Sequence, residues 1–318
     1  MSVVTLEFEK PIAELEAKLA EWESLSSSSH IDSSDEVNAL KAKIEAMKKS
    51  TYGALTPWQR VQLARHPNRP YTLDYIERFC TDFLEFHGDR RYADDLAIVG
   101  GFAKIDNIPV MVIGTQKGRN TKENVMRNFG CPHPEGYRKA LRMMQLAEMA
   151  KLPIITFIDT PGAFPGVASE ERHIGEAIAV NLREMFSFTV PIICVVIGEG
   201  GSGGALAMAV CDELAMLENA LYSVISPRGA ASILWKDGTK EKEACEVLKI
   251  TAEDLVNFGV CDKIIAEPTG GAHMSKEQTA DNIYEYLVDA VFRLKKADTQ
   301  QLLEQRYAKF RKIGMFTE

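Results

Sequence analysis

The chain has 318 residues, 46% of them hydrophobic, and a formal net charge of −8. This length suffices for one large domain with a sizeable core and an extension, and the acidic balance argues against non-specific binding of nucleic acid. The six cysteines are scattered without a C-x-x-C pair, so we expect reduced thiols and no metal site in this chain. Glu7 and Glu9 do not suit a signal peptide, and no apolar run reaches the length of a membrane span, so we expect a cytoplasmic protein without membrane contact.

Two amphipathic stripes at helical spacing occupy residues 11–49, separated by a serine-rich break from Ser26 to Ser34. Their apolar positions are Ile12, Leu15, Leu19 and Trp22, then Val37, Leu40, Ile44 and Met47. Two helices cannot bury such stripes alone, so the hairpin should pack on the main domain or on a partner; a solvated flexible arm is the alternative. We predict a helical hairpin for subunit contact at residues 1–50, a main domain at 51–295 and a helical tail at 296–318.

Strands and helices alternate from about residue 97 to 266, which predicts an α/β core with parallel strands. The expected strands include 97–105, 110–114, 154–158 and 192–197, with a turn at Asp106–Asn107. Helices are expected at 72–86, 136–151, 170–188 and 276–312, and the polar stretch 117–134 is predicted to be a surface loop.

Two loops each follow a buried strand, one at residues 159–166 and one at 198–204. Ligands of such sheets lie beyond the carboxyl ends of the strands, so both loops should border one site. The Asp-x-x-Gly pattern at Asp159 and Gly162 resembles a GTPase motif, but the chain has no Gly-Lys dipeptide for a phosphate loop. Neither loop supplies an evident histidine–carboxylate pair, so the chemistry should use backbone donors, with acid and base from the substrate or another chain.

The glycine loop Gly200-Gly201-Ser202-Gly203-Gly204 admits several interpretations. It matches the G-x-S-x-G elbow of serine hydrolases, and Asp262 and His273 follow in that fold's order; however, the apolar run ends at Ile197, several residues before Ser202. A dinucleotide loop would need G-x-G-x-x-G spacing. An oxyanion hole of backbone N–H groups and a plain tight turn fit equally well.

A second group of residues is basic within an acidic chain: Arg65, His66, Arg69, Arg138 and Lys139. These side chains could receive a phosphate, but a solvated surface is the favoured interpretation.

Several longer stretches resemble the alpha subunits of the bacterial-type acetyl-CoA carboxylase carboxyltransferase. They are RHPNRPYT (65–72), GTQKG (114–118), RNFG (127–130), PEGYRKA (134–140), FIDTPGAFPG (157–166), IGEGGSGGAL (197–206), YSVISP (222–227) and SILWK (232–236). The resemblance covers nearly the whole chain. It implies a crotonase-type (ClpP/crotonase) fold of stacked β-β-α units.

The resemblance also implies the reaction. A carboxyl group would pass from carboxybiotin, held covalently on a separate biotin carboxyl carrier protein, to acetyl-CoA, giving malonyl-CoA for fatty acid biosynthesis. In the family, backbone N–H groups stabilise the biotin ureido oxygen, which implies Gly203 and Gly204 here. Gly162, Ala163, Phe164, Gly200, Gly201 and Ser202 would bind substrate.

The implied partners are a zinc-ribbon-bearing beta subunit, in a heterotetramer of two alpha and two beta subunits, and biotin carboxylase beside the carrier protein. Two departures from the family pattern stand near the expected site: Arg228 replaces a glutamate and His173 replaces a glycine. The alternatives are a subunit of a related acyl-CoA carboxylase, a crotonase-fold hydratase or serine peptidase, and a non-catalytic assembly subunit.

Overall fold

The computed structural model describes residues 4–29 and 34–314, and within these ranges eight strands form one sheet in the order β1-β2-β3-β4-β5-β6-β8, with β7 paired to β5. The strands are β1 (Thr81–Glu85), β2 (Ile98–Ile105), β3 (Ile108–Thr115), β4 (Ile154–Thr160), β5 (Ile192–Gly201), β6 (Glu213–Leu217), β7 (Leu221–Ser223) and β8 (Lys263–Ile265). β1, β2 and β3 pair antiparallel, and every pair from β3 onward is parallel. The predicted α/β core with parallel strands is confirmed.

The predicted turn at Asp106–Asn107 is also confirmed. Asp106 (φ 48°) and Asn107 (φ 61°) both adopt left-handed backbone conformations between β2 and β3. Two successive positive φ values match the strand twist of a two-residue hairpin, and Asp and Asn tolerate them better than most residues.

β5 is longer than the sequence indicates, because it continues past Ile197 to Gly201. Its first part pairs with β6 at residues 193–196, and its last part pairs with β7 at residues 199–201. The prediction that the strand ends at Ile197 is therefore wrong. The five glycines from 198 to 204 carry no strand pattern of their own, and pairing with β7 and β4 determines the extension.

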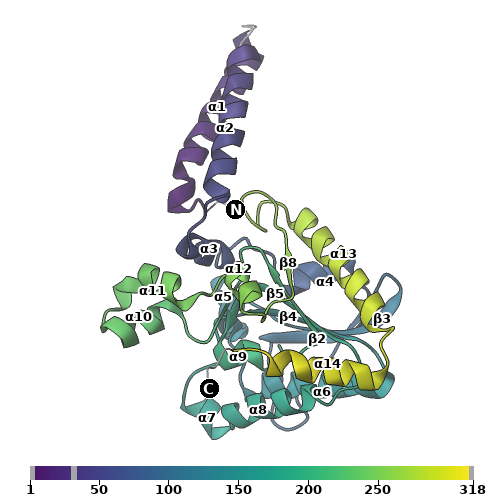
Figure 1. The fold of residues 1–318 in the computed structure, drawn as a ribbon. Coiled ribbons are helices and arrows are strands. Elements are labelled where there is room, and N and C mark those ends of the chain that lie inside the picture. Colours follow the sequence, from purple (N-terminus) through teal and green to yellow (C-terminus); the bar gives the residue numbers. More distant parts are fainter. Residues whose placement is uncertain (1–3, 30–33, 315–318) are drawn as a thin grey trace.

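Most helices lie around the sheet, and α1 and α2 project away from it (Figure 1). Those up to β4 are α1 (Lys10–Ser29), α2 (Ser34–Tyr52), α3 (Pro57–Ala64), α4 (Thr72–Phe79), α5 (Thr121–Met126) and α6 (Pro134–Ala150). After β4 come α7 (Val167–Glu171), α8 (Ile174–Met185), α9 (Ser202–Leu206), α10 (Pro227–Trp235), α11 (Glu241–Leu248), α12 (Ala252–Asn257), α13 (Lys276–Leu294) and α14 (Thr299–Arg311).

Four predicted elements differ from the structure. The helix expected at 72–86 ends at Phe79, since residues 81–85 pair with β2. The helix expected at 170–188 breaks at His173, whose backbone is left-handed (φ 64°). The one expected at 276–312 divides before Asp298, which caps α14, and α5 lies within the stretch expected to be a loop.

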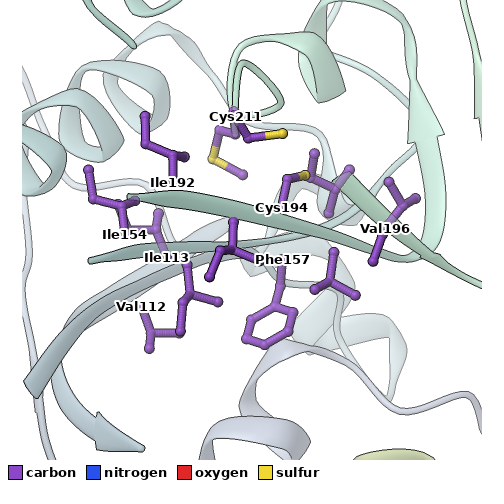
Figure 2. Close-up of a cluster of buried hydrophobic side chains, with 14 of the residues drawn as sticks. Val112, Ile113, Ile154, Phe157, Ile192, Cys194, Val196 and Cys211 are labelled. Atoms are coloured by element: carbon purple, nitrogen blue, oxygen red, sulfur yellow. The ribbon is translucent and has the colours of Figure 1, made fainter. Parts of the chain in front are cut away.

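The core follows the three central parallel strands. Ile154, Ile192 and Val196 are fully buried, and Figure 2 shows them with neighbouring side chains from β3, β4 and β5. Burying one such side chain contributes about 1.5–3 kcal/mol. A strand covered on both faces is mostly apolar, which explains the continuous apolar run 192–197 and the run 154–158, where the one polar residue, Thr156, is buried and donates to the Met208 carbonyl oxygen.

α1 and α2 form the predicted helical hairpin, which projects away from the sheet (Figure 1). Ile12 and Ile44 are each 3% exposed, whereas Trp22 near the far end is 43% exposed. The serine-rich break is shorter than expected, because α1 continues to Ser29. The Tyr52 hydroxyl donates to Glu9, tying the base of the hairpin together (2.9 Å).

α14, within the predicted tail, packs on the main body. Arg306 is 1% exposed and donates to the carbonyl oxygens of Met185, Phe188 and Val190 and to the Asp212 carboxylate. The division of the chain into three parts stays a prediction. No helix in the part of the chain that the structure describes is long and apolar enough to cross a membrane.

Candidate functional site

The two predicted loops lie against each other, as expected. A Cβ atom built on Gly204 would collide with the backbone nitrogen of Ala163 and lie 2.5 Å from the carbonyl carbon of Gly162. One built on Gly201 would collide with the carbonyl group of Pro161. Glycine is therefore required at positions 201 and 204, where the backbones of the two loops approach closely.

Ser202 lies directly at the strand-to-helix junction with a left-handed backbone (φ 52°). Contrary to the prediction, Ser202 therefore does not lie several residues beyond the strand end, because β5 reaches Gly201. The elbow nevertheless lacks its partners in the structure. Asp262 accepts hydrogen bonds from Leu214 and Lys309, and His273 stacks on His66 with ring centroids 3.7 Å apart.

A cavity of about 400 Å³ opens beside Ser202 and Gly203. It is lined by Ser202, Gly203, Leu206, Ala209, Leu214, Tyr222, Ser223, Val224, Leu255, Val260, Phe310 and Ile313. Its walls are apolar with three hydroxyl groups, and this described lining contains no carboxylate, imidazole or amine. Such a cavity suits an uncharged ring held by a few polar groups.

Gly203 and Gly204 occupy the second and third positions of α9. The first N–H groups of a helix have no partner within it. Among the described residues neither N–H donates to a protein acceptor outside the helix. Gly203 is half-buried in the cavity wall, whereas Gly204 is buried against the loop 161–166.

The remaining predicted site residues divide into two groups. Gly200 lies against the ring of Tyr222, and Gly162 and Ala163 lie against Gly204, so these are close to the cavity. Phe164 instead packs against His133 in a tilted arrangement, with ring centroids 4.1 Å apart.

Sequence reasoning missed a network of four charged residues behind the glycine loop: Lys117, Asp159, Glu199 and Arg65. We call it the Lys117 network. The Lys117 ammonium bridges Asp159 (2.7 Å) and Glu199 (3.1 Å), and Arg65 pairs with the other oxygen of Glu199 (2.7 Å). The same Asp159 oxygen accepts the backbone N–H of Glu199 (2.9 Å). The sequence signal that could have revealed this network is a charged residue at the end of an apolar strand run, which occurs at Asp159 and at Glu199.

Burial opposes ionisation in the Lys117 network, but its opposite charges outweigh burial. Burial acts to raise the pKa of Glu199, yet Lys117 and Arg65 hold that pKa below its ordinary value. Burial likewise acts to lower the pKa of Lys117, and the two carboxylates raise it. One oxygen of Asp159, Oδ2, is buried without a hydrogen-bond partner among the described residues. Buried unpartnered oxygens are uncommon, so this one needs an explanation.

The predicted basic group does not form a solvated surface. Arg69 and Lys139 are fully buried and His66 is 2% exposed. Arg69 pairs through two nitrogens with Glu267 (2.5 and 3.0 Å), while Lys139 pairs with Asp94 (2.7 Å).

The structure shows the surroundings of the two departures from the family pattern. His173 stands in a left-handed backbone conformation (φ 64°), which glycine adopts without strain and other residues adopt at a cost of about 1–2 kcal/mol. Arg228 is exposed in the first turn of α10, and its side chain lies near Gly238.

No group of three metal-ligating side chains is present among residues 4–29 and 34–314. The six cysteines, all within these ranges, are unpaired.

Comparison with known proteins gives one consistent family. The family model described as "Acetyl co-enzyme A carboxylase carboxyltransferase-like" matches residues 5–314. The acetyl-coenzyme A carboxylase carboxyl transferase subunit alpha of Geobacillus sp. (strain WCH70) is 57% identical over 99% of this chain and 97% of its own length. That of Geobacter metallireducens is 56% identical over 98% of both chains.

Solved structures confirm the fold. Transcarboxylase 12S superposes with a TM-score of 0.59 at 21% identity, over 72% of this chain and 42% of that one, so this chain matches less than half of it. The MdcD-MdcE hetero-dimer of a Pseudomonas malonate decarboxylase gives a TM-score of 0.57 at 17% identity, over 70% and 90% of the two chains. The expected crotonase-type fold is thereby confirmed.

Proposed function

The chain belongs to the family of acetyl-CoA carboxylase carboxyltransferase alpha subunits, and we propose that the backbone N–H groups of Gly203 and Gly204 form its oxyanion hole. The reaction is a carboxyl transfer to acetyl-CoA. The observation that carries the proposal is a pair of N–H groups that have no acceptor outside the helix in the part of the chain that the structure describes, one of them in the wall of the apolar cavity. Aligned N–H donors stabilise negative charge on an oxygen, and losing one such donor costs about 2.7–4 kcal/mol.

The apolar cavity fits the biotin group. A bicyclic urea is uncharged and largely apolar, and the cavity offers about 400 Å³ with hydroxyl groups on Ser202, Tyr222 and Ser223. Carboxybiotin, covalently attached to a separate carrier protein, supplies the carboxyl group when it is bound. The Gly203 N–H would donate to its ureido oxygen from the cavity wall, and the N–H of Gly204, the next residue of the same helix turn, would be the second donor.

The remaining residues of the two loops would bind and orient the substrate. Gly200, Gly201 and Ser202 would contribute one side of the site, and Gly162 and Ala163, which lie against Gly204, would contribute the other. Phe164 would cover the outer end of the loop formed by residues 159–166. Because the described cavity lining has no basic side chain, this chain would orient the reactants and stabilise charge without moving a proton itself.

The contrast between Gly203 and Gly204 provides the test. A Cβ atom on Gly203 would meet only the Ile178 side chain, at 3.6 Å, whereas one on Gly204 would collide with the neighbouring loop. Gly203→Ala keeps its N–H and should retain most of the carboxyl transfer activity, while Gly204→Val should abolish it in an intact complex. Near-normal turnover by assembled Gly204→Val would refute the assignment.

A serine hydrolase is a second candidate, because Ser202 does occupy a strained strand-to-helix turn. Without a histidine partner among residues 4–29 and 34–314, its hydroxyl should not be nucleophilic. Ser202→Ala should therefore keep most of the carboxyl transfer activity, and a fluorophosphonate probe should leave the chain unlabelled. Covalent labelling at Ser202 would establish the hydrolase instead.

We further propose that the chain is half of an enzyme. It would assemble with a zinc-ribbon-bearing beta subunit as a heterotetramer, and act in the cytoplasm with biotin carboxyl carrier protein and biotin carboxylase. The subunit name of its relatives and the projecting hairpin with exposed Trp22 support this. The chain alone should make no malonyl-CoA, and adding a beta subunit should produce both activity and a heterotetramer by light scattering. Equal turnover by the isolated chain would contradict the proposal.

The hairpin would provide part of the subunit contact. Trp22→Ser should weaken assembly while leaving the core fold intact, because this side chain is 43% exposed in the isolated chain. Arg183→Gln, an exposed change on α8, is the control and should leave assembly unchanged. Equal light-scattering profiles for Trp22→Ser and the unaltered chain would remove the hairpin tip from the contact.

A further inference from the structure

A second cavity, of about 260 Å³, lies between α6, α8 and the loop that precedes β2. Its lining is rich in arginine, and comprises Asp89, Arg90, Arg91, Arg138, Leu141, Arg142, Gln145, Glu176, Ala177, Val180 and Asn181. None of these residues lines the apolar cavity beside Gly203. The chain carries a net charge of −8, so four guanidinium groups around one cavity are a local reversal of its charge.

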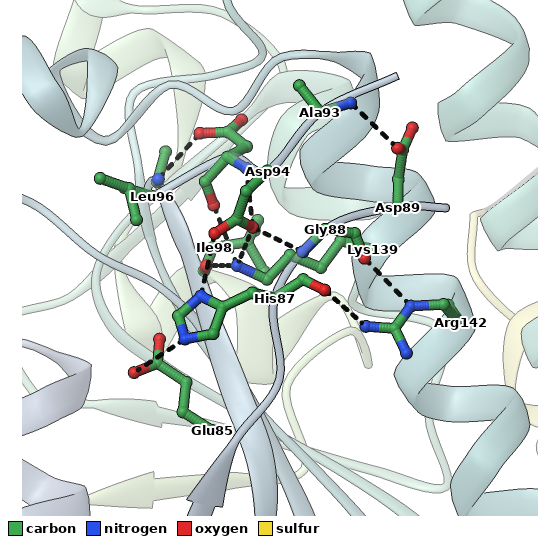
Figure 3. Close-up of polar contacts among 12 residues, drawn as sticks. Glu85, His87, Gly88, Asp89, Ala93, Asp94, Leu96, Ile98, Lys139 and Arg142 are labelled. Atoms are coloured by element: carbon green, nitrogen blue, oxygen red, sulfur yellow. Dashed lines mark hydrogen bonds and ion pairs between the residues drawn. The ribbon is translucent and has the colours of Figure 1, made fainter. Parts of the chain in front are cut away.

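Two of these arginines, Arg90 and Arg142, donate hydrogen bonds to the same carbonyl oxygen, and neither is paired with a carboxylate among the described residues. Arg142 donates to the carbonyl oxygens of Gly88 (3.0 Å) and His87 (3.1 Å), contacts that Figure 3 draws for the labelled residues. Arg90 donates to the same His87 oxygen (2.8 Å). Neither arginine forms an ion pair with a carboxylate among the described residues. Burial, and then the positive charge of Arg90, lower the pKa of Arg142 from its ordinary value.

The carboxylates at this cavity do not balance the arginines. Asp89 pairs with Arg138 (2.8 Å), and its other oxygen accepts the backbone N–H groups of Arg91, Tyr92 and Ala93. Glu176 is then the other carboxylate in the lining, and its single negative charge faces the three positive charges of Arg90, Arg91 and Arg142. The cavity thus has an excess of positive charge before any ligand binds.

The arginines are also held in place. The three N–H bonds to Asp89 fix the turn that presents Arg90 and Arg91, and Arg90 itself has a left-handed backbone (φ 63°). Arg138 and Arg142 lie one turn apart on α6, and Arg138 also donates to the carbonyl oxygen of Arg172 (3.1 Å). A preformed set of donors loses less entropy on binding than free surface side chains would.

We propose that this arginine cavity binds a phosphorylated small molecule through its phosphate or diphosphate group. Guanidinium groups match phosphate oxygens with paired, charge-assisted hydrogen bonds. A bound dianion would neutralise Arg90 and Arg142, which now face each other across one carbonyl oxygen. The volume exceeds that of a single phosphate and accommodates a diphosphate. The bound phosphate group belongs either to a coenzyme A molecule or to a separate phosphorylated ligand.

The test is a calorimetric titration of the full chain with inorganic pyrophosphate at low ionic strength, which requires no turnover and is therefore independent of the proposed function. We expect saturable binding that weakens at least about tenfold in Arg142→Gln and in Arg90→Gln, since losing one charged hydrogen-bond donor costs about 1.5–3 kcal/mol. Arg90 is exposed, so its replacement keeps the test valid if Arg142→Gln unfolds. Arg183→Gln on α8, where Arg183 pairs with Glu184, is the matched control and should bind normally.

Absence of saturable binding, or equal weakening in the control, would overturn the proposal. A second titration distinguishes the sources of phosphate. One outcome is that coenzyme A displaces pyrophosphate from the unaltered chain and yet leaves in place the pyrophosphate that Arg90→Gln still binds. In that case the cavity holds the coenzyme's phosphates. If coenzyme A leaves pyrophosphate binding unchanged, the same cavity serves a separate phosphorylated ligand.

Discussion

Two buried ionic clusters flank the end of β5, and they differ in how completely their polar atoms are used. We call the first cluster the Arg69–Glu267 pair, because these two side chains form two hydrogen bonds with each other. Arg69 also donates to the Ile197 carbonyl oxygen (2.7 Å). The Glu267 carboxylate also accepts hydrogen bonds from Asn219 and Ala272. The Lys117 network leaves Asp159 Oδ2 without a partner among the described residues. One cluster is complete by itself and the other is not.

The difference separates a structural role from a positioning role. The Arg69–Glu267 pair joins the segment between α3 and α4, β5 and the loop after β8, and neither residue is in the lining of the apolar cavity. The Lys117 network holds the backbone N–H of Glu199, directly before the glycine loop, through Asp159. We therefore expect changes in the pair to affect stability, and changes in the network to affect the activity of folded molecules.

Breaking the Arg69–Glu267 pair should have the largest effect on stability. Arg69→Met leaves the Glu267 carboxylate buried without its counter-ion, and removing one member of a buried pair costs about 3–5 kcal/mol. Urea unfolding would measure this loss. Arg78→Gln, at the exposed pair with Asp281, is the control and should change stability by less than about 1 kcal/mol. A loss of similar size in both variants would show that burial does not matter here.

Breaking the Lys117 network should lower activity in molecules that remain folded. Lys117→Met removes the cation between two carboxylates, so Asp159 and Glu199 should separate and displace the glycine loop. A displacement of about 1 Å at a catalytic group can reduce kcat about 100-fold. The measurement is kcat and KM of the assembled complex, and we expect the loss in kcat rather than in KM. Unchanged kcat in a well-assembled complex would make this network purely structural.

A smaller effect concerns the pH dependence around the Arg69–Glu267 pair. Burial, followed by the charges of His66 and Arg69, lowers the pKa of His273 from 6.5 to about 4. Because the folded-state pKa is the lower one, this contribution to stability is complete above pH 6.5 and is lost as the pH falls toward 4. Allowing for partial exposure, we expect about 1–2 kcal/mol.

Comparing the free energy of unfolding at neutral pH and at about pH 5 measures this contribution. The unaltered chain should lose more stability on acidification than His273→Gln does. An equal loss in the two proteins would mean that another group titrates in this window.

Much of the sheet and the meeting of the two loops could be predicted, because both depend on local patterns. Apolar runs identified β4 and β5, and adjacent parallel strands bring their carboxyl ends together. The helix expected at 72–86 failed because Phe79 and Phe83 fit a helical stripe as well as they fit α4 followed by β1. Only pairing with β2 decides between the two.

The Lys117 network could not be predicted, because its parts are remote in sequence. Lys117 lies 42 and 82 residues from its partners Asp159 and Glu199, and a lysine in a polar stretch ordinarily indicates a surface loop. The extension of β5 to Gly201 was equally hidden, since glycines carry no strand pattern. In both cases contacts between distant segments override the local signal.

The most direct test of the oxyanion hole removes one backbone N–H and nothing else. Replacing Gly203 with glycolic acid turns its amide into an ester, keeps the absence of a Cβ atom and deletes the donor. We predict that the complex assembles normally and that kcat for malonyl-CoA formation falls about 100- to 1,000-fold, while Gly203→Ala retains most activity. An ester variant with undiminished kcat would contradict the assignment of the Gly203 N–H to charge stabilisation.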